Sequence, residues 1–202
     1  TGAYRHILVV GAETLSKVID WTDRSTCILF GDGAGAAVFG PVEAGLGLQS
    51  FDLGSDGAGG DLLEIPAGGS LHPLTAEALL THGNCIQMDG RAVFRFAVKV
   101  LGETVEKSLA KAGLSKKNLD WLVPHQANTR IIDAAAKRLE LPAEKIIVDI
   151  EKYGNMSAAS IPVALAEAAH EHRFKKGDLV ALAGFGAGLT WASCIMKWAK
   201  ED

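Results

Sequence analysis

Residues 179–198 read LVALAGFGAGLTWASCIMKW, and this stretch is the strongest single indication of the fold. The apolar run Leu179–Ala183 has the length of a buried β-strand, and it ends at the glycine-rich segment Gly184–Gly188. A second apolar strand is expected at Leu189–Trp198. The pattern predicts two buried strands that are joined through a glycine turn.

The same glycine pattern occurs near the other end of the chain. Residues 28–40 read ILFGDGAGAAVFG, in which Gly31–Gly35 repeat the spacing G-x-G-A-G of Gly184–Gly188. Strands are expected on both sides of this segment, at Cys27–Phe30 and Ala36–Phe39. We interpret the echo as a sign of two related halves, each ending in a glycine-turned hairpin, although two unrelated glycine loops would give the same short match.

Between these segments, strand-length apolar runs alternate with helical patterns. Apolar residues recur at spacings of three and four between residues 93 and 112, which predicts a helix that stops at Gly113. Further helices are expected at Asn128–Leu139 and Ser157–His172, and further strands at Ile7–Val10, Trp121–Val123 and Lys145–Ile150. Residues 41–75 are rich in Gly, Asp, Ser and Pro, and we interpret them as loops and edge strands.

This alternation predicts an α/β fold with a mostly parallel sheet covered by helices. We expect residues 1–75 to form the end of one half and its connecting segment, and residues 76–202 to form the second half. The chain lacks an initiator Met and runs almost at once into the apolar run that starts at Ile7. We therefore expect it to begin inside a fold.

The composition excludes several classes of protein. With 202 residues, 48% of them hydrophobic, the chain is long enough to bury a core. The net charge of -4 shows no basic excess of the kind that nucleic-acid binding needs. No apolar stretch has the length of a membrane span, and no signal peptide opens the chain. We expect a cytoplasmic protein without nucleic-acid or membrane partners, with its three distant cysteines reduced.

Two polar residues stand at positions where chemistry is common. His125 follows an expected strand and precedes a helix, at the edge of the sheet where ligands bind in α/β folds, and it can donate a hydrogen bond or relay a proton. From position alone, it could equally cap the strand end. Asn155 follows Gly154 in a loop, and its amide can stabilise a developing oxyanion, although Asn also favours ordinary turns.

The remaining candidates carry less information. The loop Gly184–Gly188 could bring backbone N–H groups close to a substrate oxygen, but it does not open a helix as a phosphate-binding loop does. Cys27, Cys85 and Cys194 are interpreted as structural, because none lies beside the cationic groups that lower a thiol pKa. The acidic residues show no metal-ligand spacing, so we expect no metal. We also expect no cofactor.

Four segments together carry a family resemblance. They are ILFGDGAGAAVFG from Ile28, DWLVPHQANTRII from Asp120, YGNMSAASIPVAL from Tyr153 and GFGAGLTWAS from Gly184. In this order they resemble the 3-oxoacyl-[acyl-carrier-protein] synthase III family, the initiating condensing enzymes of bacterial fatty-acid synthesis. The resemblance runs from Thr1 to about Trp198.

The resemblance implies a thiolase-like αβαβα fold of two similar halves and a site of Cys, His and Asn. His125 and Asn155 match the family histidine and asparagine, and Ala187 matches the position whose backbone N–H helps to form the oxyanion hole. The positions that match the CoA and pantetheine tunnel and the catalytic centre are Arg24, Gly90, Phe94, Ala127, Asn128 and Phe185. Arg130 matches a basic position implicated in docking of the carrier protein.

The chain departs from the family in one respect. The family nucleophile is a cysteine upstream of a segment that Thr1–Tyr4 resembles, and no residue here matches it. The resemblance therefore implies a homodimeric enzyme that condenses acyl-CoA, expected to be acetyl-CoA, with malonyl carrier protein, and whose N-terminal part supplies the nucleophile. Two alternatives stay open: a related acyltransferase of secondary metabolism, and a noncatalytic subunit that binds a carrier protein.

Overall fold

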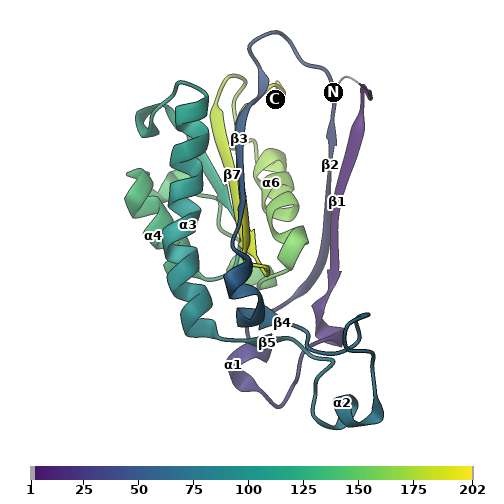
Figure 1. Ribbon diagram of the computed structural model, residues 1–202. Coiled ribbons are helices and arrows are strands. Elements are labelled where there is room, and N and C mark those ends of the chain that lie inside the picture. Colours follow the sequence, from purple (N-terminus) through teal and green to yellow (C-terminus); the bar gives the residue numbers. More distant parts are fainter. Residues whose placement is uncertain (1–2, 202) are drawn as a thin grey trace.

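A four-stranded sheet in the order β3-β8-β7-β6 forms the centre of the structure, a computed structural model that describes residues 3–201 (Figure 1). Its strands are β3 (Gly47–Ser55), β6 (Trp121–Pro124), β7 (Leu179–Gly186) and β8 (Thr190–Lys197). Only β6 and β7 run parallel, so the prediction of a mostly parallel sheet is wrong for this sheet. The reason is that β7 turns directly into β8, and β3 then pairs antiparallel with β8 at the edge.

Helices cover both faces of this sheet. Helices α3 (Gly90–Lys111) and α4 (Thr129–Leu139) pack on one face, and α6 (Ser160–His170) packs on the other (Figure 1). The alternation of side chains along the strands divides the core accordingly. Leu122 and Ile195 face the cluster with α3 and α4, whereas Val123 and Val180 face the cluster with α6.

A second, two-stranded sheet lies beyond α6 and is called the ribbon below. It consists of β1 (Ile7–Thr14) and β2 (Asp32–Phe39), which pair antiparallel from Ile7↔Phe39 to Thr14↔Asp32. The molecule thus has four layers: α3 with α4, the four-stranded sheet, α6, and the ribbon (Figure 1). This is a layered α/β fold of the kind that the sequence predicts.

Glycines allow the ribbon to approach the helical layer closely. A Cβ atom at Gly11 would lie 2.2 Å from the carbonyl oxygen of Ala158, and one at Gly35 would lie 2.8 Å from the backbone nitrogen of Val163. Gly31–Gly35 therefore do not form the predicted turn: residues 32–35 belong to β2. Glycines in a strand here permit backbone contact between layers rather than a reversal of the chain.

Two predicted strands are wrong. The segment Cys27–Phe30 contains the end of α1 (Arg24–Cys27), which Asp23 caps by accepting a hydrogen bond from the Ser25 N–H. The segment Lys145–Ile150 contains only an isolated parallel bridge between Leu122 and Ile146. In both places the chain makes a single bridge and no continuous ladder, which periodicity over so short a run cannot reveal.

The predicted helices are confirmed. Helix α3 begins earlier than expected, because the Asp89 side chain caps the amides of residues 91 and 92. Asn128 caps α4 by accepting from the Arg130 N–H, and Pro162 lies in the first turn of α6. The remaining elements are η1 (Leu15–Lys17), η2 (Gly57–Leu62), β4 (Leu63–Glu64), α2 (Ala76–Leu80), β5 (Gln87–Met88), η3 (Lys116–Asn118), η4 (Ala143–Lys145), α5 (Ile150–Tyr153) and η5 (Ser157–Ala159).

The proposed division of the chain at residue 75 stays a prediction. The edge strand expected within residues 41–75 is present as β3, and it pairs with β8 of the four-stranded sheet. Thr1 and Gly2, which belong to the segment used for the family resemblance, lie outside the described residues. Within residues 3–201, no helix combines the length and apolar character that a membrane span requires.

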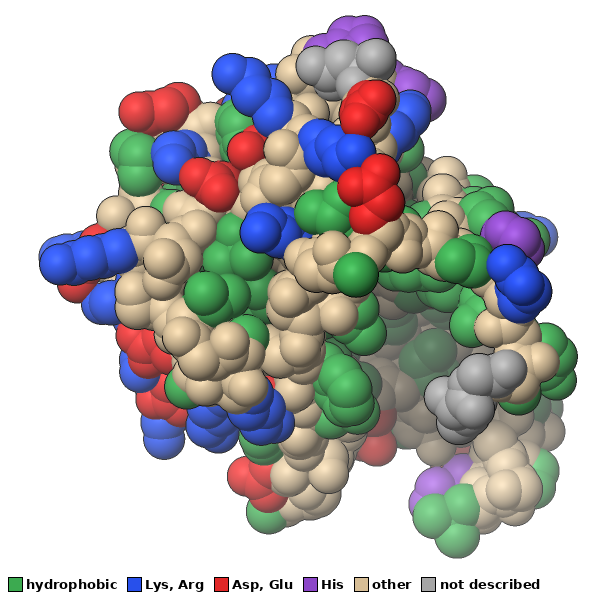
Figure 2. Space-filling view, turned by 90° about the horizontal axis from the view of Figure 1, so that it is seen from above, with side chains coloured by type: hydrophobic (Ala, Val, Ile, Leu, Met, Phe, Trp, Pro, Cys, Tyr) green, Lys and Arg blue, Asp and Glu red, His purple; other side chains and the backbone are tan. Residues whose placement is uncertain are grey.

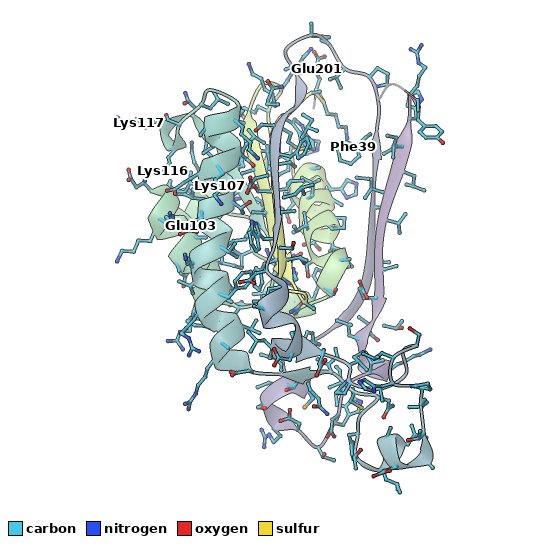
Figure 3. The ribbon with its side chains drawn as sticks, viewed as in Figure 1. Phe39, Glu103, Lys107, Lys116, Lys117 and Glu201 are labelled. Carbon is cyan, nitrogen blue, oxygen red and sulfur yellow. The ribbon has the colours of Figure 1, made fainter. Side chains whose placement is uncertain are left out.

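Charged side chains are concentrated on the outer side of α3 and α4 (Figure 2 and Figure 3). Figure 2, viewed from above, shows mixed charges over the side of α3 and α4 and hydrophobic side chains in a hollow toward the ribbon. Glu103 and Lys107 point outward from α3 (Figure 3). Arg138 of α4 pairs with Glu103 at 3.3 Å and with Glu106 at 2.8 Å. Such exposed pairs contribute only about 0–1 kcal/mol each.

Candidate active site

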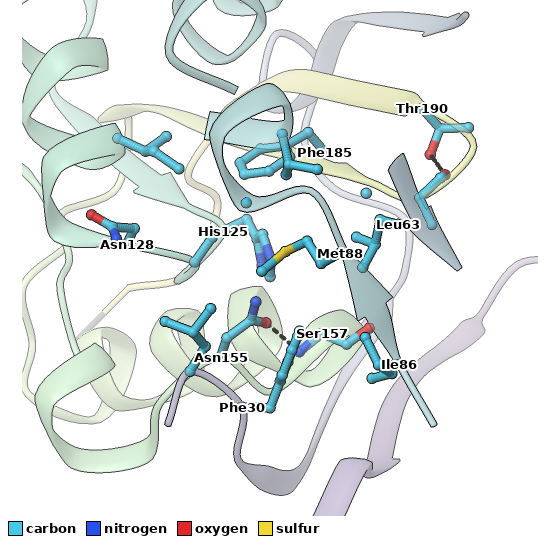
Figure 4. A pocket seen from close by; sticks show the side chains of 18 of the residues that line it. Phe30, Leu63, Ile86, Met88, His125, Asn128, Asn155, Ser157, Phe185 and Thr190 are labelled. Atoms are coloured by element: carbon cyan, nitrogen blue, oxygen red, sulfur yellow. Dashed lines mark hydrogen bonds between the residues drawn. The ribbon is translucent and has the colours of Figure 1, made fainter. Parts of the chain in front are cut away.

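His125 and Asn155 line the same cavity, which has a volume of about 680 Å³. They reach it from different elements: His125 follows β6, and Asn155 follows α5. The lining is mostly apolar, with contributions from the α3 N-terminus, the β4–β5 pair and the β7–β8 hairpin (Figure 4). A few polar groups in an apolar cavity are typical of a ligand site.

The backbone and the ring of His125 are both held in place. Its N–H donates to the carbonyl oxygen of Ala183 at 2.8 Å, which continues the pairing of β6 with β7 by one residue. The ring meets the Phe185 ring edge to face, with 5.4 Å between centroids. Burial lowers the pKa of the imidazole to about 4. The ring is therefore neutral at physiological pH and has one N–H to donate.

The backbone of Asn155 is clamped by a distant part of the chain. Its N–H donates to the carbonyl oxygen of Leu29, and its carbonyl accepts from the N–H of Gly31, each at 2.9 Å. Gly154 has a φ of 70°, which favours glycine, and a Cβ at Gly31 would lie 2.0 Å from the Tyr153 carbonyl oxygen. The two glycines allow this clamp to form.

The side chain of Asn155 has a defined orientation. Its Oδ1 accepts a hydrogen bond from the N–H of Ser157 at 2.9 Å. Because the oxygen is engaged there, the amide nitrogen is directed toward His125 (Figure 4). The imidazole of His125 and the amide of Asn155 thus line one cavity, each with a hydrogen-bond donor.

The β7–β8 hairpin closes one side of the cavity. Phe185 and Gly186 at the end of β7 and Ala187 in the turn all line it. The turn is narrower than the predicted segment Gly184–Gly188, because β7 extends to Gly186. The Ala187 carbonyl accepts from the Thr190 hydroxyl at 3.0 Å, which fixes the turn.

Most of the other residues predicted for the site also line this cavity. They are Gly90, Phe94, Ala127 and Asn128. Arg24 and Arg130 do not line it: Arg24 is exposed on α1, where its neighbour Ser25 reaches the cavity. The Arg130 guanidinium lies 5.5 Å from the centroid of the Phe94 ring, which places it beside the lining.

Sequence reasoning missed the β4–β5 pair. Leu63, Ile86 and Met88 of this region line the cavity opposite Phe185 (Figure 4). Two-residue strands carry no readable periodicity, and the surrounding segment looks like a loop. The alternation of apolar residues at positions 86 and 88 was the one available signal.

The cavity lining, as far as the chain is described, contains no cysteine. Cys85 is buried elsewhere, and its thiol pKa is raised by burial and by the charge of Asp20. Burial also raises the pKa of the Cys194 thiol. A thiol with a raised pKa is a poor nucleophile at neutral pH. This agrees with the interpretation of Cys85 and Cys194 as structural residues.

Two family models match the chain. The C-terminal model of 3-oxoacyl-[acyl-carrier-protein (ACP)] synthase III matches residues 109–198, and the 3-oxoacyl-[acyl-carrier-protein (ACP)] synthase III model matches residues 1–57. Together they account for more than half of the chain.

Similar proteins carry the same name. The beta-ketoacyl-[acyl-carrier-protein] synthase III of Desulfitobacterium hafniense (strain DSM 10664 / DCB-2) is 58% identical over 201 residues, which are 100% of this chain and 61% of that protein. A crystal structure of the synthase III from Thermus thermophilus is 47% identical with a TM-score of 0.86, over 98% of this chain and 60% of that one. The structure from Pseudomonas aeruginosa PAO1 is 43% identical with a TM-score of 0.87, over 100% and 60%.

The chain thus spans about three fifths of the length of the relatives it matches. Motifs, layered fold and similarity agree over this whole span. The chain belongs to the 3-oxoacyl-[acyl-carrier-protein] synthase III family.

Proposed function

We propose that the chain forms the decarboxylation side of a 3-oxoacyl-[acyl-carrier-protein] synthase III. The observation that carries this proposal is that His125 and the oriented amide of Asn155 line one cavity. The intact enzyme joins an acyl group from acyl-CoA, with acetyl-CoA expected, to malonyl carrier protein and thereby initiates fatty-acid synthesis. It acts in the cytoplasm and uses no cofactor, because the CoA thioester is a substrate.

The reaction has two stages. A cysteine thiolate attacks the acyl-CoA carbonyl, CoA leaves as the thiol, and the acyl group stays on the cysteine as a thioester. Malonyl carrier protein then loses CO₂, and the electron pair of the broken C–C bond forms an enolate at its thioester. The enolate carbon attacks the acyl-cysteine, and expulsion of the thiolate leaves 3-oxoacyl carrier protein.

His125 and Asn155 act on the second stage. As neutral donors, they hydrogen-bond the enolate oxygen, where negative charge develops. A neutral imidazole suits this role, because it does not protonate the nascent carbanion as a cationic one would. The N–H of Ala187, at the cavity edge, donates to the tetrahedral oxyanion of the acyl-cysteine.

The nucleophile belongs to the N-terminal part of the same enzyme. The exposed ribbon supports this assignment, because Leu8 is 65% and Val38 69% exposed in the chain as described. A further segment that covers those side chains would complete the second sheet and bring the cysteine to the cavity. We also propose a homodimer, as the family resemblance implies.

Asn155→Ala in the assembled enzyme tests the division of roles. Malonyl decarboxylation should fall about 10²–10³-fold, because one donor to the enolate is lost. Transfer of the acyl group from CoA to the cysteine should change little. Asn84→Ala, away from the cavity lining, is the control and should leave both steps intact. Equal loss of both steps would contradict the proposed role of Asn155.

Arg130→Glu tests the docking of the carrier protein. Arg130 is exposed beside Phe94 at the cavity, where it can meet an acidic partner. Charge reversal should raise the KM for malonyl carrier protein at least tenfold and leave the KM for acyl-CoA almost unchanged. Lys176→Glu, at the other end of the molecule near Glu201, is the charge-matched control. An unchanged KM in Arg130→Glu removes this residue from docking.

A further inference from the structure

Strand β6 has a partial neighbour on the side opposite β7. Residues 146–149 run parallel to it: Leu122 and Ile146 form a bridge, and the Ile147 N–H donates to the Leu122 carbonyl at 2.9 Å. In a parallel ladder of this register, the N–H of residue 124 would next donate to the Ile147 carbonyl. Residue 124 is proline and has no N–H, so the ladder cannot continue.

The side chain of Gln126 occupies the place of the missing rung. Its Nε2 donates to the Ile147 carbonyl at 3.1 Å and to the Pro124 carbonyl at 2.9 Å. Its Oε1 accepts from the Asp149 N–H at 3.1 Å. These are the three backbone groups that a continued ladder would have paired, and the Gln126 side chain is completely buried.

This carboxamide joins the two segments that carry the donors of the site. Gln126 directly follows His125, whose own N–H is fixed to β7. On the other side, Asp149 directly precedes α5, and its carbonyl accepts hydrogen bonds from the N–H groups of Lys152 and Tyr153 in that helix. In the next bond along the helix, the Gly154 N–H donates to the Ile150 carbonyl at 2.8 Å, and Asn155 follows.

We propose that Gln126 is a positioning residue that sets the distance between His125 and Asn155. It touches neither the cavity nor a reacting atom, and it acts through the backbone on both sides. The catalytic consequence rests on the proposed function, whereas the structural role does not. A buried amide with three partners suits this task, because any of these buried backbone groups left unpaired would destabilise the segment.

Hydrogen exchange of the chain carrying Gln126→Met tests the structural role without any activity measurement. Methionine keeps the length of the side chain and removes all three hydrogen bonds. We expect backbone amides of residues 147–157 to exchange at least tenfold faster, with exchange in α3 unchanged. Gln49→Met is the matched control, because Gln49 bonds only Gly45 and Gly47 at the surface, and it should leave residues 147–157 unchanged. Unchanged exchange at 147–157 in Gln126→Met would overturn the proposal.

The wild-type chain provides a test in case this variant does not fold. In NMR spectra, the side-chain amide protons of Gln126 should exchange with water at least 100-fold more slowly than those of exposed Gln49. Exchange at equal rates would mean that the Gln126 amide is not held, and the positioning role would be refuted.

Kinetics of the assembled enzyme then separate positioning from general stability. Gln126→Met should lower kcat for decarboxylation at least tenfold and leave the KM for acyl-CoA within twofold. A kcat equal to that of the wild type, despite faster exchange at 147–157, would refute the link to catalysis. Absence of condensation in the wild-type enzyme would instead refute the proposed function and leave the exchange result standing.

Discussion

The β7–β8 pair and the β1–β2 ribbon have the same local design and opposite surroundings. Each consists of two antiparallel eight-residue strands. The β7–β8 pair has β6 and β3 on its outer edges and helices on both faces, so Val180 and Ile195 are completely buried. Within residues 3–201 the ribbon has no further strand, and Leu8 and Val10 are more than half exposed. Apolar sequence specifies which strands pair, but neighbouring elements decide how much stability the pair gains.

The largest expected difference between the two regions is in local opening. Amide protons in the β7–β8 ladder should exchange about 1000-fold more slowly than those in the β1–β2 ladder, because the ribbon opens without disturbing the rest. Hydrogen exchange measured by NMR on the 202-residue chain checks this. Equal protection in both ladders would show that the ribbon belongs to the cooperative core.

Glycine-to-alanine substitutions in one strand of each pair compare how closely the ribbon and the β7–β8 pair are packed. Gly11→Ala should destabilise the chain by about 3 kcal/mol, because its Cβ would meet the Ala158 carbonyl oxygen at 2.2 Å and backbone must move. Gly184→Ala in β7 should cost below about 1 kcal/mol, since its Cβ would meet the flexible end of Ile161 at 3.4 Å. Urea unfolding gives both values. A larger loss for Gly184→Ala would contradict the described packing of the ribbon on the helical layer.

A hydroxyl group introduced by a Val-to-Thr substitution should lower the free energy of unfolding more in the buried β7–β8 pair than in the exposed ribbon. Val180→Thr should lower the free energy of unfolding by about 2 kcal/mol, because the hydroxyl is buried among apolar side chains. Val10→Thr in the ribbon should change it by no more than about 0.5 kcal/mol, since Val10 is 57% exposed. Thermal unfolding of both variants measures the difference. Comparable losses would mean that the ribbon is covered in solution.

Asp149, near the well-packed sheet, is an exception because it is buried without hydrogen-bond partners for its carboxylate. Its substitution is expected to have the smallest effect on stability. Both carboxylate oxygens of Asp149 are buried without a hydrogen-bond partner, and burial, together with the charge of Glu167, raises the pKa of this carboxyl to about 6. The folded state therefore binds the proton more tightly than the unfolded state. The stability that this group contributes is present below about pH 3.8 and is lost as the pH rises through about 6.

Asp149→Asn removes that loss. The full shift from 3.8 to about 6 sets a limit of about 3 kcal/mol, and solvent screening reduces it. The variant should therefore be about 1 kcal/mol more stable than the wild type at pH 8, and the gain should vanish below about pH 4. The lowered pKa of His125 destabilises both proteins equally as the pH falls below 6.5, so it cancels in the difference. A gain that does not depend on pH would contradict the raised pKa of Asp149.

Long periodic patterns and specific motifs made much of the fold predictable. Helix α3 has six turns of apolar spacing, and α4 has an Asn128 cap that the sequence already displays. The short apolar runs at Cys27–Phe30 and Lys145–Ile150 predict strands, but each segment makes only a single bridge. What holds them is side-chain and backbone contact with Asn155 or β6, and such long-range partners leave no local pattern.

The site was predictable in its polar residues and less so in its walls. His125, Asn155 and Ala187 were expected together, and the structure places them on one cavity. The clamp by Leu29 and Gly31 could not be foreseen, because it joins residues more than 120 positions apart. Arg24 was expected in the tunnel, but α1 turns it outward and leaves Ser25 at the cavity.

The clamp on Asn155 by Leu29 and Gly31 limits where the gene of such an enzyme can be divided. The main chain of Asn155 is anchored by the residues that lead into β2 of the ribbon, far away in the gene. A genetic break between β2 and β3 would part the asparagine from its anchor, even though each product kept its own sheet. Recombination that exchanges one sheet for a foreign one would have to preserve both backbone hydrogen bonds of Asn155.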